Sequence, residues 1–89
     1  MKCIYFGPDR ISSMDDLYDV FSQELSFPAY FGRNLDALYD CLSERREPVA
    51  VYLCDEETLK QTLGRKAEGL FRVFAQCERE GVLILRRIS

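Results

Sequence analysis

Residues 30–43 carry the side chains of this chain that are best suited to catalysis or to binding a charged partner. The segment reads Tyr-Phe-Gly-Arg-Asn-Leu-Asp-Ala-Leu-Tyr-Asp-Cys-Leu-Ser. Helical spacing places Asp36, Asp40 and Ser43 at positions i, i+4 and i+7, opposite the leucines and beside Tyr39. Carboxylates one turn apart can bind a cationic surface, act in general acid–base catalysis or weakly chelate a divalent ion. The segment therefore predicts a charged binding surface or a small carboxylate site.

Asp40 stands where helix stability disfavours it. Aspartate is a poor helix former, it lies toward the negative end of the expected helix, and it repels Asp36 one turn away. Position 44 is Glu44, so no cation one turn later relieves the repulsion. These effects sum to about 1 kcal/mol. Asp36 alone needs no functional explanation, because an acid in the first turn favours the helix dipole.

The neighbours of the two aspartates favour a binding surface over a merely solvated helix face. Tyr30 and Tyr39 are large contact groups of the kind found in interfaces. Tyr30 and Phe31 also occupy a loop, where solvated chains usually carry small polar residues. Gly32 permits close backbone approach. The pattern predicts an acidic, aromatic-rimmed surface that binds protein.

The chain has no histidine, which excludes several classes of site. An imidazole general base and a His-activated serine or cysteine nucleophile are both impossible. An enzyme would need tuned carboxylates, a lysine or a thiolate. The four cysteines, Cys3, Cys41, Cys54 and Cys77, fit no zinc-site spacing and each sits in an apolar pattern, so we expect buried, reduced thiols. We expect no metal and no cofactor.

The net charge of −3 is unevenly distributed. Residues 36–57 carry seven acids and two arginines, whereas residues 58–89 carry seven basic groups and three acids. The acidic block would repel a phosphate backbone and attract a cationic surface. We therefore expect no direct nucleic-acid partner.

The 89 residues support one small core, so we expect a single domain, 1–89. No apolar run approaches the roughly 18 residues of a membrane span, and the N-terminus is too short for a secretory signal. We expect a cytoplasmic protein without membrane contact.

Hydrophobic spacing predicts seven elements. They are a strand at 2–6, a helix from about 14 to 25 or 26, a helix at 35–42 capped by Asn34, a strand at 49–54, a short helix before Gly64, a helix ending at Gly81, and a strand at 82–85. Both crossovers are long enough for parallel connections. The apolar run 49–54 suggests a strand covered on both faces. The fold class is α/β, a three-stranded parallel sheet with packed helices; the isomer of the bond before Pro48 is left open.

The segment from Pro28 to Leu42 closely resembles the signature of the barstar family, small bacterial inhibitors of secreted ribonucleases. The likeness extends over essentially the whole chain. It implies the same α/β fold and a mechanism of occlusion without turnover. Asp40 would place its carboxylate where the scissile phosphate binds, and Asp36 would pair with a basic group at the rim. Tyr30 would pack on the catalytic imidazole.

The resemblance extends the surface to neighbouring positions. Gly32 would let the loop approach the partner, Asn34 would add a polar contact, and Glu80 would add a secondary acidic one. Tyr39 stands where the family often has tryptophan and Ser43 where it often has threonine. The implied partner-binding residues are Tyr30, Gly32, Asn34, Leu35, Asp36, Ala37, Tyr39, Asp40, Ser43, Glu47 and Glu80. The implied partner is a small secreted microbial ribonuclease of the guanyl-preferring type, in a 1:1 complex.

Two departures and four alternatives stay open, one of the alternatives being a fold-only paralogue that has lost its partner. Gln76 replaces an acid of the best-known family member, and Arg45 and Arg46 stand in a stretch that is less basic there, so the target ribonuclease is undetermined. An immunity or antitoxin protein against another nuclease toxin would use the same acidic helix. A small carboxylate- or metal-dependent enzyme would use Asp36 and Asp40, without an apparent third ligand. The basic last third could bind RNA, although solvated helix faces look the same.

Overall fold

The computed structural model describes residues 2–7 and 9–88, and the order of elements within them is the predicted one. In chain order these are β1 (Lys2–Phe6), α1 (Met14–Leu25), α2 (Leu35–Ser43), β2 (Val49–Cys54), α3 (Glu56–Leu63), α4 (Lys66–Arg79) and β3 (Leu83–Ile88). Across this described part, no helix has the length and apolar character to cross a membrane.

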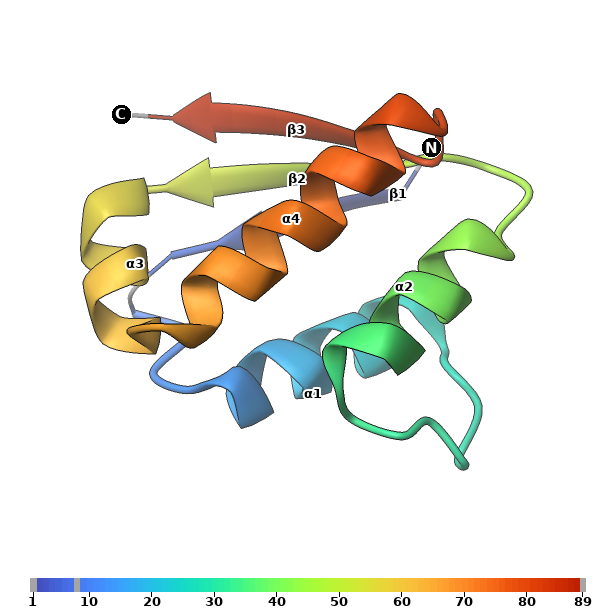
Figure 1. The fold of residues 1–89 in the computed structure, drawn as a ribbon, viewed down its shortest axis with the longest axis horizontal. Helices are drawn as coiled ribbons and strands as arrows, with labels where there is room; N and C mark the ends of the chain where they lie inside the picture. Colours follow the sequence, from blue (N-terminus) through green and yellow to red (C-terminus); the bar gives the residue numbers. More distant parts are fainter. Residues whose placement is uncertain (1, 8, 89) are drawn as a thin grey trace.

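The three strands form a parallel sheet in the order β1-β2-β3. Ile4, Val51 and Leu85 lie side by side across it. Figure 1 shows α4 running across the strands, α2 beside α4, and α3 at the end where β2 finishes. The predicted α/β fold, a three-stranded parallel sheet with packed helices, is confirmed.

The helices cover one face of the sheet, so the prediction that the middle strand is covered on both faces is wrong. Alternate strand residues enter a core to which all seven elements contribute. On the opposite face Tyr5 is 52% exposed and stacks on Tyr52 with ring centroids 4.8 Å apart. Tyr52 is half-buried, and Ala50 is small enough to be buried without a second layer of helices. An apolar run in a middle strand can thus be shielded partly by its neighbouring strands.

The last strand is longer than predicted, because its second half is polar. It begins at Leu83 and continues through Arg86 and Arg87 to Ile88, all three of them exposed. Charged side chains are common on edge strands, where they oppose pairing with another chain. Hydrophobicity therefore marks only the buried half of this strand.

The cysteine prediction holds only in part. All four thiols are free, but only Cys77 is buried; Cys41 and Cys54 are half-buried and Cys3 is exposed. Cys3 lies on the open face of the sheet, so its apolar surroundings in the sequence do not bury it. Burial raises the pKa of the Cys77 thiol to about 11. The bond before Pro48 is trans, since no cis peptide bond occurs within the described residues.

Candidate protein-binding surface

The start of α2 is fixed by Asn34. Its side-chain Oδ1 accepts a hydrogen bond from the backbone N–H of Ala37 at 2.8 Å, and its Nδ2 donates to the carbonyl of Gly32 at 3.2 Å. A Cβ at Gly32 would lie 3.1 Å from the Asn34 Nδ2 and 3.4 Å from the Ala37 Cβ. A side chain at position 32 would therefore crowd the Asn34 cap, which explains glycine at this position without reference to a partner. The predicted cap is confirmed, and it orders the loop that precedes the helix.

The inner side of α2 packs on α4. Leu38 and Leu42 are fully buried. Leu35 is half-buried and lies over Gly69 of α4. A Cβ added at Gly69 would lie only 2.6 Å from the Leu35 Cδ1. The absence of a side chain at Gly69 lets the two helices approach closely. This packing turns the opposite side of α2 toward solvent.

The outward side of α2 and the loop before it present one surface, which we name the acidic face: Tyr30, Gly32, Asn34, Asp36 and Asp40. All five residues are exposed, and Tyr30 is 88% exposed. Among the described residues, neither the Asp36 nor the Asp40 carboxylate has an ion-pair or hydrogen-bond partner. The face thus offers two unpaired negative charges and an exposed aromatic ring.

The other predicted positions surround this face to different degrees. Leu35, Ala37, Tyr39 and Ser43 are half-buried, and the Ser43 hydroxyl donates to the Asp40 backbone carbonyl at 3.0 Å, within the helix end. Glu47 is exposed in the segment after α2. In the part of the chain that is described, no three Cys, Asp or Glu side chains gather closely enough to hold a metal ion.

Of the two aromatic loop residues that suggested a binding surface, Tyr30 and Phe31, only Tyr30 is exposed, because Phe31 packs against the core. Phe31 is half-buried, and its ring packs edge-on against Tyr18 with centroids 5.8 Å apart. Phe31 also contacts Phe27 at 5.0 Å, and Phe27 stacks toward Phe21 of the core at 6.4 Å. Among the three aromatic rings of residues 27–31, only that of Tyr30 is exposed, so Tyr30 lies outside this cluster. The packed rings of Phe27 and Phe31 hold the loop, and Tyr30 remains available for contact with a partner.

Glu80 is already engaged within the chain. The Tyr39 hydroxyl donates a short hydrogen bond to Glu80 Oε2, and the Gln76 side-chain amide donates to the same oxygen at 2.8 Å. These bonds tie α2 to the end of α4. An acid at position 76 could not donate in its ionised form, so glutamine suits this arrangement. The contacts with Gln76 and Tyr39 lower the pKa of the Glu80 carboxyl, and the hydrogen bond to Glu80 raises the pKa of Tyr39 to about 12.

We expect Glu80→Gln to make one additional tyrosine ionise between pH 10 and 11. With the carboxylate removed, the pKa of Tyr39 should fall from about 12 toward its ordinary value of 10.0. A raised pKa means that this contact stabilises the fold below pH 10 and that the stabilisation is lost as the pH rises toward 12. Absorbance at 295 nm counts ionised tyrosines, and circular dichroism at each pH verifies that the chain is folded. Tyr39→Phe is the control, since Glu80→Gln should then change nothing; an unchanged titration in the single variant would contradict the contact.

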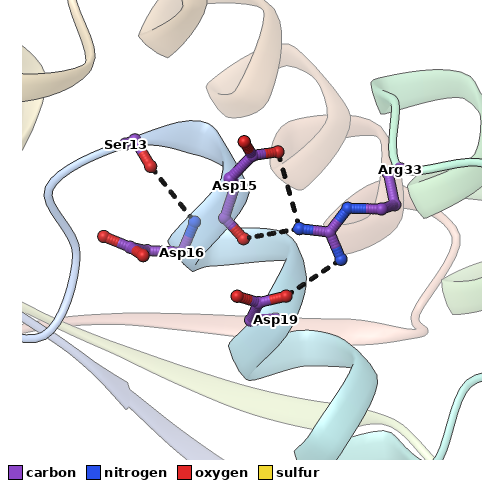
Figure 2. A network of polar contacts seen from close by, with 5 residues as sticks. All are labelled: Ser13, Asp15, Asp16, Asp19 and Arg33. Carbon is purple, nitrogen blue, oxygen red and sulfur yellow. Dashed lines mark hydrogen bonds and ion pairs between the residues drawn. The ribbon is translucent and has the colours of Figure 1, made fainter.

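Arg33 is a residue whose role the sequence does not reveal. Figure 2 shows its guanidinium between two aspartates of α1. Nη1 lies 2.9 Å from Asp19 Oδ1, and Nη2 lies 3.0 Å from the Asp15 backbone carbonyl and 3.5 Å from its Oδ1. The guanidinium also lies over the Tyr18 ring, 5.9 Å from its centroid. The aspartates occur 14 and 18 residues earlier in the chain, so no local spacing predicts the contact.

Arg45 and Arg46 lie differently from one another. Arg46 is exposed, whereas Arg45 is half-buried and lines a hollow beside Phe27 and Pro28. The Arg45 Nε is buried and has no hydrogen-bond partner in the described residues. Of the two arginines, Arg46 is therefore the more accessible to a partner.

The comparisons with known proteins agree with this geometry. The model of the family described as "Barstar (barnase inhibitor)" matches residues 1–85. The chain is also 35% identical over 80 residues to "Putative ribonuclease inhibitor YrdF" of Bacillus subtilis (strain 168), an alignment that covers 89% of this chain and 87% of that protein. A parallel three-stranded sheet that presents a capped helix with unpaired aspartates fits the same assignment. The chain belongs to the barstar family.

Proposed function

We propose that this protein inhibits a small secreted microbial ribonuclease of the guanyl-preferring type, as a 1:1 complex formed in the cytoplasm. The acidic face enters the cationic active-site cleft and blocks access of RNA. The protein acts by occlusion and carries out no reaction of its own. Membership of an inhibitor family, together with the described relative, supports the role in ribonuclease inhibition.

The observation that carries the proposal is the pair of unpaired carboxylates on α2. Asp36 and Asp40 are exposed on a rigid, capped helix, and the helix tolerates Asp40 at a cost to its own stability. A cleft built to bind phosphate presents arginine and lysine donors, which form charge-assisted hydrogen bonds with a carboxylate. Following the resemblance to the barstar family, we assign Asp40, near the middle of α2, to the phosphate position and Asp36 to the rim.

The rest of the face supplies contact area and approach. Tyr30 offers a rigid, exposed ring that can pack on a flat catalytic side chain without losing much conformational entropy. Gly32 lies between Tyr30 and α2 and has no side chain that could keep the partner away from the loop backbone. Complementary charge accelerates the encounter of the two proteins, and this acceleration decreases with salt. The four free thiols suit a reducing compartment such as the cytoplasm.

Titration against guanyl-preferring secreted ribonucleases tests the proposal. We expect RNA cleavage to fall linearly with added protein and to stop at one equivalent, because a tight occluding inhibitor removes enzyme molecules one by one. Calorimetry without RNA gives the stoichiometry independently. If no ribonuclease of this type is inhibited but another nuclease toxin is titrated, the protein is an immunity protein of that toxin. Turnover of a substrate by the chain alone would contradict inhibition as its function.

A further inference from the structure

Arg33 is the only basic residue between Phe27 and Ser43. Its neighbours Gly32 and Asn34 both belong to the acidic face. An extended guanidinium at this place would oppose a cationic cleft, since like charges across an interface are unfavourable. The position of the Arg33 side chain therefore matters for any cationic partner.

The structure places this side chain on α1, in a hollow that it lines together with Asn34 and Asp36 of the acidic face. The backbone carbonyl and the carboxylate of Asp15 accept hydrogen bonds from the guanidinium, and the Asp19 carboxylate forms an ion pair with it. The charges of Asp15 and Asp19, on either side of the guanidinium in Figure 2, offset that of Arg33. The guanidinium also lies over the Tyr18 ring. The start and position of α1 are themselves fixed by the Ser13 cap, whose Oγ accepts from the Asp16 N–H at 3.3 Å. The contacts of Arg33 with Asp15 and Asp19 thus join the loop before α2 to a helix whose start is capped by Ser13.

The backbone at Arg33 gives an independent indication. Its φ is 51°, in the left-handed region that non-glycine residues seldom adopt. Such a conformation persists only where surrounding contacts hold it. It lies immediately before the Asn34 cap, so it sets the direction in which the loop meets α2. The side-chain contacts with α1 hold it, together with the Asn34 cap and the packed rings of Phe27 and Phe31.

We propose that Arg33 is a positioning residue for the acidic face: held by Asp19 and Asp15, it fixes residues 27–34 in the binding conformation before the partner arrives, while the two carboxylates offset its own charge. The inference rests on the proposed function and assigns to this residue a role in it. An ordered loop loses less conformational freedom on binding, which slows dissociation of the complex.

The first experiment uses the free protein. Phe31 N–H donates to the Pro28 carbonyl at 3.0 Å and reports on the order of the loop. We expect Arg33→Gln to accelerate hydrogen exchange of this amide by up to about fivefold, the upper end of the range for losing an exposed ion pair. Arg87→Gln is the matched control, because it removes an ion pair of the same length, 2.9 Å to Glu56, at the far end of β3. The control should leave Phe31 unchanged.

The second experiment measures dissociation of the ribonuclease complex. Arg33→Gln and Asp19→Asn should each accelerate dissociation about fivefold. Because both act through the same contact, the double variant should be no faster than either single variant. Arg87→Gln should dissociate like the wild type. A purely structural loss of stability would accelerate neither the Phe31 amide selectively nor dissociation in this non-additive way.

The outcomes separate this inference from the proposed function. Unchanged exchange at Phe31, an unchanged dissociation rate, or additive effects in the double variant would each overturn the role of Arg33. If the wild-type protein inhibits no ribonuclease, the proposed function is wrong. The exchange experiment, which needs no partner, still decides whether Arg33 orders the loop.

Discussion

Replacing Asp40 by alanine is expected to weaken binding of the ribonuclease by about 30-fold to several thousand-fold, or about 2–5 kcal/mol. The carboxylate has no partner within the described residues, so the free protein loses no contact. In the complex, however, the basic groups of the cleft would be left buried without their counter-charge. The inhibition constant measured by RNA cleavage, and the dissociation rate, give the effect.

The same substitution should change stability in the opposite direction. Alanine is a better helix former than aspartate, and its introduction removes the repulsion with Asp36. We therefore expect Asp40→Ala to raise the free energy of unfolding by up to about 1 kcal/mol. A variant that is more stable yet inhibits poorly cannot owe its defect to misfolding. Denaturation in urea measures this directly.

Glu57→Ala is the matched control for Asp40→Ala. Both remove one exposed acid from a helix and change the net charge equally, but Glu57 lies on α3, which Figure 1 shows at the opposite end of the molecule from α2. The control should lower the association rate slightly through long-range electrostatics and leave dissociation unchanged. If the two variants inhibit equally well, Asp40 does not occupy the phosphate position.

Local signals account for the parts of this protein that its sequence predicts well. Ser13 and Asn34 cap their helices through bonds to backbone groups three residues later, and Gly64 and Gly81 adopt positive φ values where two helices end. Each of these features depends on a few consecutive residues. Helix starts, helix ends and the apolar sides of helices can therefore be predicted from residue types and their spacing.

The unpredicted parts depend on contacts between distant residues. Glu80 bonds to Tyr39, 41 positions earlier, and Arg33 bonds to Asp15, 18 positions earlier. Neither pairing follows from residue type or spacing, because it is decided by how α1, α2 and α4 pack. Cys3 shows the same limit for burial: its strand is apolar, but only the folded sheet determines which face is open.

The candidate site lies between these cases. Asp36 and Asp40 share a helix face by spacing alone, and the structure places both in solvent. Whether they bind a ribonuclease stays a prediction. Phe31 shows how the same segment can mislead, since an aromatic residue beside an exposed one proves to be anchored on Tyr18. Function is easier to infer from unpaired charges on a rigid helix than from the aromatic content of a loop.

Phe21→Ala should produce the largest loss of stability, about 3–5 kcal/mol of the free energy of unfolding. Phe21 is fully buried, and its ring centroid lies 5.1 Å from that of Phe6 in the sheet, 6.1 Å from that of Phe74 in α4 and 6.4 Å from that of Phe27 in the loop before α2. Its removal leaves a cavity where sheet, helix and loop meet, and a core of this size cannot close it fully. Urea denaturation at fixed temperature measures the change.

Tyr30→Ala is the comparison that separates the two uses of aromatic residues in this chain. Its ring is 88% exposed, so its loss should change the free energy of unfolding by no more than about 0.5 kcal/mol while weakening inhibition. Phe21→Ala should show the opposite pattern, a large loss of stability with inhibition retained. At urea concentrations at which this variant is still folded, it should titrate the ribonuclease one to one. A loss below about 1 kcal/mol in Phe21→Ala would mean that the ring does not join the sheet, α4 and the loop before α2 as the structure describes. Together the two variants test whether one helix and its loop can be specialised for a partner because a separate set of buried rings holds them in place.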